Sequence, residues 1–198
     1  MDHLNIVKRC QTGELEAFEE LYNLYVKQAM KTARLLFGHR GIAEDVVQEA
    51  FIQCYKGIGE LKSPETFQAW FYKILVRAGW RIASKHQRTV VTGDFLDNPN
   101  LGNYHEPGVD EWAEIQETGH AVREAVKKLN TPMKTVVILY YYNNLTIKEI
   151  AEILDCFQGT VKSRLRKARI LLEKELEHDF RTDAPPAIYQ KKECRSNG

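Results

Sequence analysis

Residues 146–170 read TIKEIAEILDCFQGTVKSRLRKARI, and this stretch decides how the C-terminal part of the chain folds. Thr146 is followed three residues later by Glu149, the spacing of a capping box, which predicts a helix beginning at Ile147. The chain then turns over residues 155–157, and a second helix is expected to follow. Apolar residues recur on one face of each helix: Ile147, Ile150, Ala151 and Leu154 on the first, and Val161, Leu165 and Ala168 on the second. Two helices joined by a tight turn with this pattern predict a helix-turn-helix.

Polar and cationic side chains are left for the outward face of the second helix: Gln158, Thr160, Lys162, Ser163, Arg164, Arg166 and Lys167. Early residues of such a helix reach base edges in the major groove, whereas later cations hold phosphates. A solvated helix face would also be polar, but a run of cations without any acid favours nucleic acid. We therefore predict that this face binds duplex DNA.

Charge is divided into blocks along the whole chain, which has 28 Lys and Arg against 27 Asp and Glu, for a net charge of +1. Residues 66–93 contain no acid, whereas residues 89–122 contain no Lys or Arg and several acids. A third block, residues 162–169, is again cationic. Two basic blocks separated by an acidic one predict two polyanion-binding surfaces joined by a segment that does not bind the polyanion.

The first basic block lies on a predicted helix that has Ser63 as N-cap and Pro64 at its first position. Its apolar side comprises Phe67, Trp70, Phe71, Ile74, Leu75, Ala78 and Ile82, and its cations Lys73, Arg77, Arg81 and Lys85 recur every four residues. This spacing places the cations on one face, where they repel one another unless a polyanion lies alongside. Trp80 is expected either to stack on an unpaired base or to pack against the core. The combination of cations with an aromatic predicts binding of single-stranded nucleic acid.

Two further amphipathic helices precede this one, over residues 18–36 and 43–55. The outward face of the second carries the polar residues Glu44, Asp45, Gln48 and Glu49. Residues 136–142 have strand propensity, but Thr131 and Pro132 ahead of them resemble a helix cap and first turn, so we expect a buried helix there. The chain is thus predicted to be all-α: an N-terminal helical bundle (1–90), an acidic linker (91–118), a C-terminal helix-turn-helix domain (119–178) and a tail (179–198).

The chain contains no stretch of about 18 apolar residues and no secretory leader, so we expect no membrane insertion. The four cysteines are widely spaced, which favours reduced thiols and a cytoplasmic location.

Three blocks carry a resemblance to a known family: AEDVVQEAFIQCYKGIGEL (43–61), FQAWFYKILVRAGW (67–80) and EIAEILDCFQGTVKSRLRKAR (149–169). Over residues 10–88 and 119–177 the chain resembles a bacterial ECF (extracytoplasmic function) sigma factor. The resemblance implies an alternative sigma factor that binds core RNA polymerase and directs promoter-specific initiation, and that has an anti-sigma protein as a further partner.

The resemblance also implies roles for individual residues. Glu44, Asp45, Gln48 and Glu49 would bind polymerase. Lys73, Arg77, Trp80, Arg81 and Lys85 would read and open the minus-ten element, and the face from Gln158 to Lys167 would bind the minus-thirty-five element as duplex. The family often has Asn and Asp at positions 77 and 81 and Pro near position 157, so these differences bear on the preferred promoter sequence.

The sequence is also compatible with two other classes of function. A one-component helix-turn-helix regulator, with an N-terminal dimerisation or sensing bundle, explains residues 121–177 equally well but leaves the first basic block without a purpose. An enzyme would need a site, and the sequence contains no H-E-x-x-H, Gly-rich phosphate loop or G-x-S-x-G. We therefore expect no catalytic residues, no cofactor and no metal.

Overall fold

The computed structural model describes residues 3–88 and 117–182, and every regular element in these two ranges is a helix. The all-α prediction is therefore confirmed. Nearly all of the predicted acidic linker lies outside the described residues, as does the predicted tail beyond Thr182. No helix in the two described ranges is long and apolar enough to cross a bilayer.

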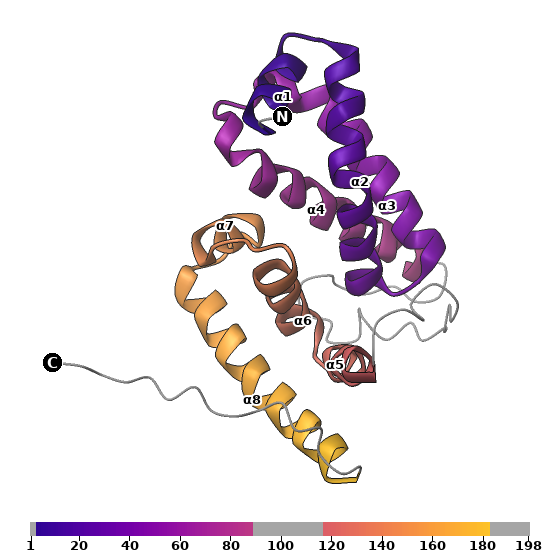
Figure 1. Cartoon of the computed structure of the whole chain (residues 1–198), viewed down its shortest axis with the longest axis vertical. Coiled ribbons are helices and arrows are strands. Elements are labelled where there is room, and N and C mark those ends of the chain that lie inside the picture. The colour runs from indigo at the N-terminus through magenta and orange to yellow at the C-terminus, as the bar shows by residue number, and fades with distance from the viewer. Residues whose placement is uncertain (1–2, 89–116, 183–198) are drawn as a thin grey trace, which may run out of the picture.

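The N-terminal group of helices forms the upper part of the molecule in Figure 1. Its elements are α1 (His3–Gln11), α2 (Leu15–Phe37), α3 (Arg40–Gly57), the short 3-10 helices η1 (Ile58–Glu60) and η2 (Pro64–Thr66), and α4 (Phe67–Arg88). Helix α3 packs against both α2 and α4. The periodic apolar residues of these helices form the core, as their spacing predicts, and the largest side chains in it are aromatic: Phe67, Phe71 and Tyr72 are fully buried.

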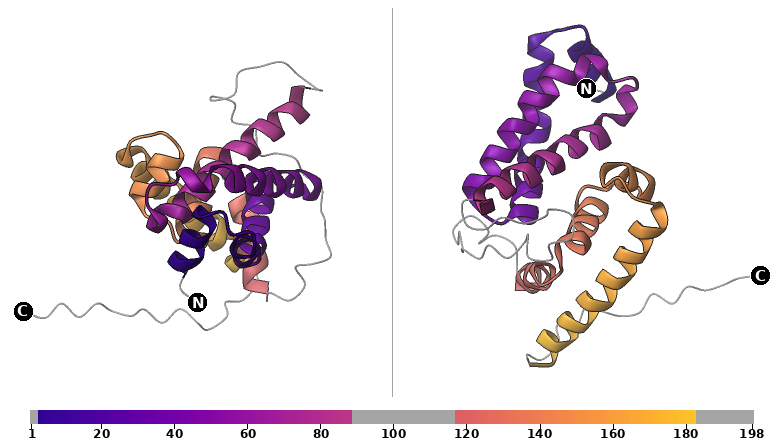
Figure 2. Two further views of the ribbon diagram at one scale, coloured as in Figure 1. Left: turned by 90° about the horizontal axis from the view of Figure 1, so that it is seen from above. Right: turned by 180° about the vertical axis from the view of Figure 1, so that it is seen from behind.

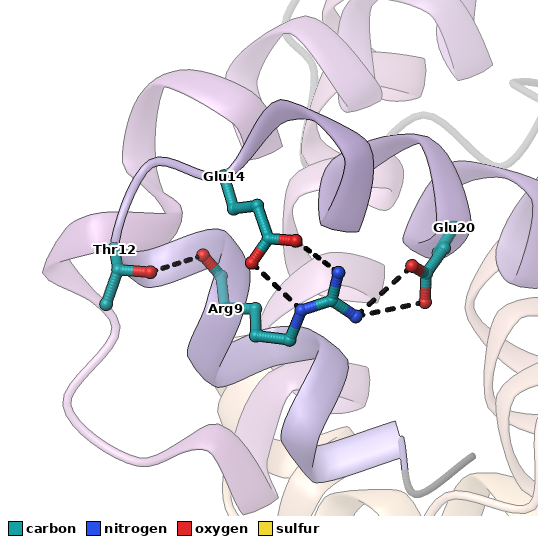
Figure 3. Close-up of polar contacts among 4 residues, drawn as sticks. All are labelled: Arg9, Thr12, Glu14 and Glu20. Atoms are coloured by element: carbon teal, nitrogen blue, oxygen red, sulfur yellow. Dashed lines mark hydrogen bonds and ion pairs between the residues drawn. The ribbon is translucent and has the colours of Figure 1, made fainter.

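Helix α1 was not predicted, and a cluster of charges holds it against α2 (Figure 3). The Arg9 guanidinium donates to both Glu14, where Nε lies 2.9 Å from Oε2, and Glu20, where Nη1 lies 3.1 Å from Oε1. Thr12 Oγ1 donates to the Arg9 carbonyl at 2.8 Å and closes the turn between the helices. The cluster is at the surface, so it fixes the angle of α1 more than it adds to stability.

The start of α4 differs in detail from the prediction. Ser63 precedes the 3-10 turn of η2, but its side chain makes no capping hydrogen bond; its carbonyl accepts from the backbone N–H of Thr66 at 3.0 Å instead. Further along, α4 passes so close to the end of α2 that a Cβ on Gly79 would lie 2.0 Å from Cζ of Phe37. A glycine in mid-helix is ordinarily unfavourable, and this close approach is the reason for it here.

The C-terminal group comprises α5 (Glu117–Lys127), α6 (Thr131–Val137), the π-helix η3 (Ile138–Tyr142), α7 (Ile147–Ile153) and α8 (Gln158–Thr182). Residues 136–142 are helical, as predicted, although their second part is a π-helix that propensity does not indicate. The expected cap at Thr131 is wrong by one residue. Asn130 is the N-cap, and its side chain accepts from the N–H of Met133 at 3.0 Å.

The helix-turn-helix is present as α7 and α8. Thr146 Oγ1 accepts from the N–H of Glu149 at 3.3 Å, and Glu149 Oε2 accepts from the N–H of Thr146 at 2.8 Å, so the predicted capping box is formed in both directions. In the turn, Asp155 has a φ of +50°, a left-handed conformation that Asp tolerates better than most residues. Val161, Leu165 and Ala168 of α8 are buried, as their spacing predicts.

The two groups of helices pack against each other, with α7 lying along α4 (Figures 1 and 2). Asn143, at the end of η3, is fully buried between them. Its Nδ2 donates to Thr32 Oγ1 of α2 at 2.8 Å, and its carbonyl accepts from Nε2 of Gln68 on α4 at 2.8 Å. These two bonds connect Asn143 to α2 and α4 across the seam, whereas its Oδ1 is buried without a hydrogen-bond partner.

Candidate nucleic-acid and polymerase interfaces

The polar face of α3 is at the surface, as predicted. Glu44, Asp45 and Gln48 are exposed and Glu49 is half-buried, because the opposite face of α3 carries the core residues. Glu44 Oε1 accepts from Arg40 Nε one turn earlier, at 2.8 Å. Three of the four predicted polymerase-binding residues are thus open to a partner.

A groove beside this face was not predicted. It has a volume of about 620 Å³, it lies between α2 and α3, and Glu44 and Gln48 form part of its lining. Apolar side chains from both helices supply most of the rest, including Phe18, Tyr22, Ile52 and Tyr55. Tyr22, Ile52 and Tyr55 are exposed. The sequence gives no clear sign of this, because Tyr22 and Tyr55 continue the apolar patterns of their helices.

Glu49 differs from the other three polar residues of α3 because its carboxylate contacts α4. Its Oε1 accepts from Gln53 Nε2 at 2.7 Å and from Arg81 Nη2 at 2.5 Å, and these two bonds hold the pKa of the Glu49 carboxyl below its usual value. Residues predicted for two different interfaces are therefore in contact. Sequence alone could not pair them, since they lie 32 positions apart.

The cationic face of α4 is arranged as its four-residue spacing predicts. Arg77, Arg81 and Lys85 are exposed and Lys73 is half-buried. Because these positions lie roughly one turn apart, the positive charges line one side of the helix. The face has the charge and length to follow a phosphate backbone, with Arg81 sharing its charge with Glu49.

The aromatics of α4 are less available than its cations. Trp80 is half-buried and packs against the core, so only part of its ring faces solvent. Trp70 is also half-buried, and Tyr72 is fully buried, where burial raises its pKa to about 12. Trp80 is therefore the one aromatic among these three that combines a core anchor with a position beside Arg81 on the cationic face.

The outward face of α8 is formed as predicted. Gln158, Lys162, Ser163, Arg166 and Lys167 are exposed, and Thr160 and Arg164 are half-buried. Gln158 and Lys162 also line a hollow shared with Tyr141, Thr146 and Lys148, which adds polar and cationic groups from the first helix of the motif. The arrangement presents hydrogen-bonding groups at the start of α8 and cations behind them, the order needed to read base edges and hold phosphates.

Arg169 of the same basic block has a structural role. Its Nε donates to Tyr141 Oη at 2.6 Å, and its guanidinium lies 5.7 Å from the centre of the Tyr141 ring. The pair ties α8 to η3. In the described ranges 3–88 and 117–182, no group of three His, Cys, Asp or Glu side chains is placed to hold a metal ion.

Comparison with known families identifies both groups of helices. Residues 21–89 match the model of sigma-70 region 2, and residues 119–172 match that of sigma-70 region 4. These matches include α3, α4, α7 and the first part of α8, the elements that carry all three surfaces.

Two curated relatives match across most of their length. The chain is 30% identical over 180 residues to the ECF RNA polymerase sigma-E factor of Haemophilus influenzae, covering 87% of this chain and 94% of that protein. It is 28% identical over 176 residues to the ECF RNA polymerase sigma factor SigW of Bacillus subtilis, covering 86% and 94%.

Solved structures share the fold. CnrH, in complex with the cytosolic domain of CnrY, has a TM-score of 0.63 at 18% identity, covering 89% of this chain and 98% of that one. The sigma factor RpoE of Bartonella quintana, in complex with the anti-sigma factor NepR, has a TM-score of 0.63 at 20% identity, covering 83% and 99%.

Proposed function

Because this chain belongs to the ECF sigma factors of RNA polymerase, we propose that it uses the three surfaces described above to bring the enzyme to a promoter. It is an alternative sigma factor: it binds core RNA polymerase and directs promoter-specific transcription initiation. The observation that carries the proposed roles is that each matched region exposes a cationic helix face, on α4 in the first and on α8 in the second.

Core polymerase docks on α3. Glu44, Asp45 and Gln48 supply charge and hydrogen bonds, and the neighbouring groove, with Tyr22 and Tyr55, supplies apolar area. This combination of a polar rim and aromatic anchors is typical of protein interfaces. Glu49 contributes by holding Arg81, and so couples the docking helix to the DNA-binding helix.

The α4 face binds the minus-ten element as separated strands. Lys73, Arg77 and Lys85 follow the phosphates, and Trp80 stacks on an unpaired base. Stacking of one base on an aromatic contributes about 1–3 kcal/mol, comparable with the few kcal/mol needed to unstack a base step. Arg81 can exchange Glu49 for a phosphate, because an exposed ion pair contributes only about 0–1 kcal/mol.

The α8 face binds the minus-thirty-five element as duplex. Gln158 and Thr160 lie at the start of the helix, where base edges are read, and Lys162, Ser163, Arg164, Arg166 and Lys167 hold the phosphates on either side. Neutralising about six phosphates across both faces makes the affinity fall with roughly the fifth power of salt concentration.

The protein catalyses no reaction in this proposal, since polymerase performs the chemistry and the sigma factor contributes binding energy only. Its partners are core polymerase, promoter DNA and an anti-sigma protein, and it acts in the cytoplasm. The anti-sigma partner is supported by the exposed groove on α2 and α3, which an inhibitor can cover in competition with polymerase.

Run-off transcription tests the proposal. Core polymerase is incubated with genomic fragments with and without the purified chain, and discrete transcripts are expected only when the chain is present. The one-component regulator predicts a different result: a dimer by gel filtration that binds promoter duplex tightly without polymerase. Tight binding of a single promoter by the purified chain alone at physiological salt, with no transcript from the complete reaction, would refute the sigma assignment of these surfaces.

A further inference from the structure

Phe157 is a large hydrophobic residue at the surface, with 87% of its surface accessible. It is the N-cap of α8, since its carbonyl accepts from the N–H of Thr160 at 2.9 Å and α8 begins at the next residue. The side chain therefore projects from the leading end of the helix whose outward face is assigned to duplex DNA.

Folding gives no reason for a phenylalanine at this position. An N-cap side chain ordinarily accepts a hydrogen bond from the first turn, and Ser, Thr, Asp and Asn do so whereas Phe has no acceptor. Exposure also leaves the ring without the burial that makes phenylalanine favourable elsewhere. When a residue breaks two local rules without a compensating contact, a functional site is the usual explanation.

The backbone on either side of Phe157 is held firmly. The N–H of Cys156 donates to the carbonyl of Ala151 at 3.0 Å, and the Cys156 side chain packs against the core. Asp155 provides the left-handed turn before it. Since Cys156 is anchored inward and the next residue begins α8, the direction of the Phe157 side chain is set by the turn.

The residues next to the ring are polar. Gln158 is exposed beside it in the sequence, and Lys162 lies one turn further along α8. Both line a hollow whose other residues come from η3, the loop that follows it and the start of α7. The α8 face that begins with Gln158 and Lys162 favours a polyanion over an apolar protein surface as the occupant, although the exposed Asp155 lies two residues before Phe157. The major groove offers one apolar group to such a side chain, the C5-methyl group of thymine.

We infer that Phe157 is a specificity-determining residue that contacts the C5-methyl group of a thymine in the minus-thirty-five element. The inference rests on the proposed function, because it requires α8 to lie in the major groove of the promoter. It also gives a role to the position where the family often has proline near the turn.

Replacement of thymine by uracil tests the contact, because uracil lacks only the methyl group. Holoenzyme assembled with the full chain transcribes a promoter set in which each minus-thirty-five thymine is replaced in turn by uracil. For the wild-type chain, one replacement is expected to lower the run-off rate about four-fold, the factor corresponding to one buried methyl-sized group. With Phe157→Ser, the same replacement is expected to have no effect.

Phe157→Ser also separates specificity from folding, because serine restores a capping side chain. Its melting temperature is expected to rise by about 2–4 °C, so lost discrimination cannot come from unfolding. Phe157→Leu keeps an apolar group and is expected to keep part of the discrimination.

Two results would overturn the inference. One is a uracil effect that is the same in wild type and Phe157→Ser. The other is a Phe157→Ser defect of equal size on every promoter, which would assign the ring to a protein contact. Absence of transcripts with the wild-type chain on all templates would instead refute the proposed function, and this outcome is recognised before any uracil is introduced.

Discussion

Gly79→Ala is the substitution whose effect follows most directly from the structure. The added Cβ would lie 2.0 Å from Cζ and 2.1 Å from Cε2 of Phe37, so the ring would have to retreat by about 1.4 Å to reach an ordinary contact. Alanine should favour the helix by about 1 kcal/mol relative to glycine. Overpacking in a core is destabilising, by about 1–3 kcal/mol. We expect the upper end of this range, because the added Cβ would overlap several atoms of the Phe37 ring and Phe37 is only 9% exposed.

We therefore expect Gly79→Ala to lower the free energy of unfolding by about 2 kcal/mol. The corresponding fall in melting temperature for a chain of this size is about 4–8 °C. Urea denaturation followed by circular dichroism measures the first quantity, and a thermal scan measures the second. Trp80 and Arg81 follow Gly79 directly, so the same variant should also disturb the cationic face of α4 that is proposed to bind the minus-ten element.

A double-mutant cycle identifies the cause. Phe37→Ala is itself destabilising, but in that background Gly79→Ala should be neutral or stabilising, giving a coupling of about 2 kcal/mol or more. Gly159→Ala is the matched control for stability, because no atom lies within 4 Å of its added Cβ. Wild-type stability in Gly79→Ala, or an equal loss in both backgrounds, would show that contact with the Phe37 ring is not the cause.

Three further predictions concern the seam, the buried thiols and a buried cation. Asn143→Ala removes the bond to Thr32 in the seam, and the free energy of unfolding should fall by about 1–3 kcal/mol, with faster proteolysis between the two groups of helices; unchanged stability would show that the bond is replaceable. Burial raises the pKa of the Cys54 thiol from 9.0 to about 12. The neutral thiol should therefore contribute fully to the free energy of unfolding below pH 9, and this contribution should be lost as the pH rises towards 12. At pH 8 Cys54 should therefore be alkylated much more slowly than the half-buried Cys156, and equal rates in peptide mapping would contradict this. Lys134 is only 5% exposed, and burial lowers its pKa, so Lys134→Met should raise the melting temperature at pH 7. The gain in melting temperature should shrink as the pH approaches 10.5, because the wild-type Lys134 is then neutral and no longer carries a buried charge. A Lys134→Met variant that is less stable than wild type at pH 7 would contradict the prediction.

Local patterns predicted the elements well. The capping box at Thr146 and Glu149 and the inward spacing of Val161 and Leu165 depend only on neighbours in the same helix, and both are present. Helix α1 was missed because it has only nine residues and three buried side chains, too few to show a helical period in the sequence. Its position also depends on the ion pair between Arg9 and Glu20 of α2, which the sequence does not reveal.

Contacts between distant residues account for most of what sequence reasoning missed. The Glu49–Arg81 pair joins two helices whose outward faces were assigned separately, and nothing in either helix indicates the partner. The same holds for Asn143: nothing in its neighbouring residues indicates burial, and packing of the two groups of helices buries it. The groove beside α3 also depends on packing, because Tyr22 and Tyr55 continue the apolar patterns of their helices and only the arrangement of α2 and α3 leaves them exposed.

Charge neutralisation in reconstituted holoenzyme tests whether the two cationic helix faces act on one promoter. Lys73→Gln with Arg77→Gln removes charge from α4, and Lys162→Gln with Arg166→Gln removes it from α8. Lys27→Gln with Lys31→Gln is the matched control, an exposed pair at the same spacing on α2. Run-off transcription should fall sharply in each of the two double variants and furthest when all four substitutions are combined, whereas the control should stay near wild type. The dependence of transcription on salt concentration should weaken with the number of phosphate contacts removed. Initiation at the wild-type rate after both faces are neutralised would show that neither cationic face is needed at the promoter.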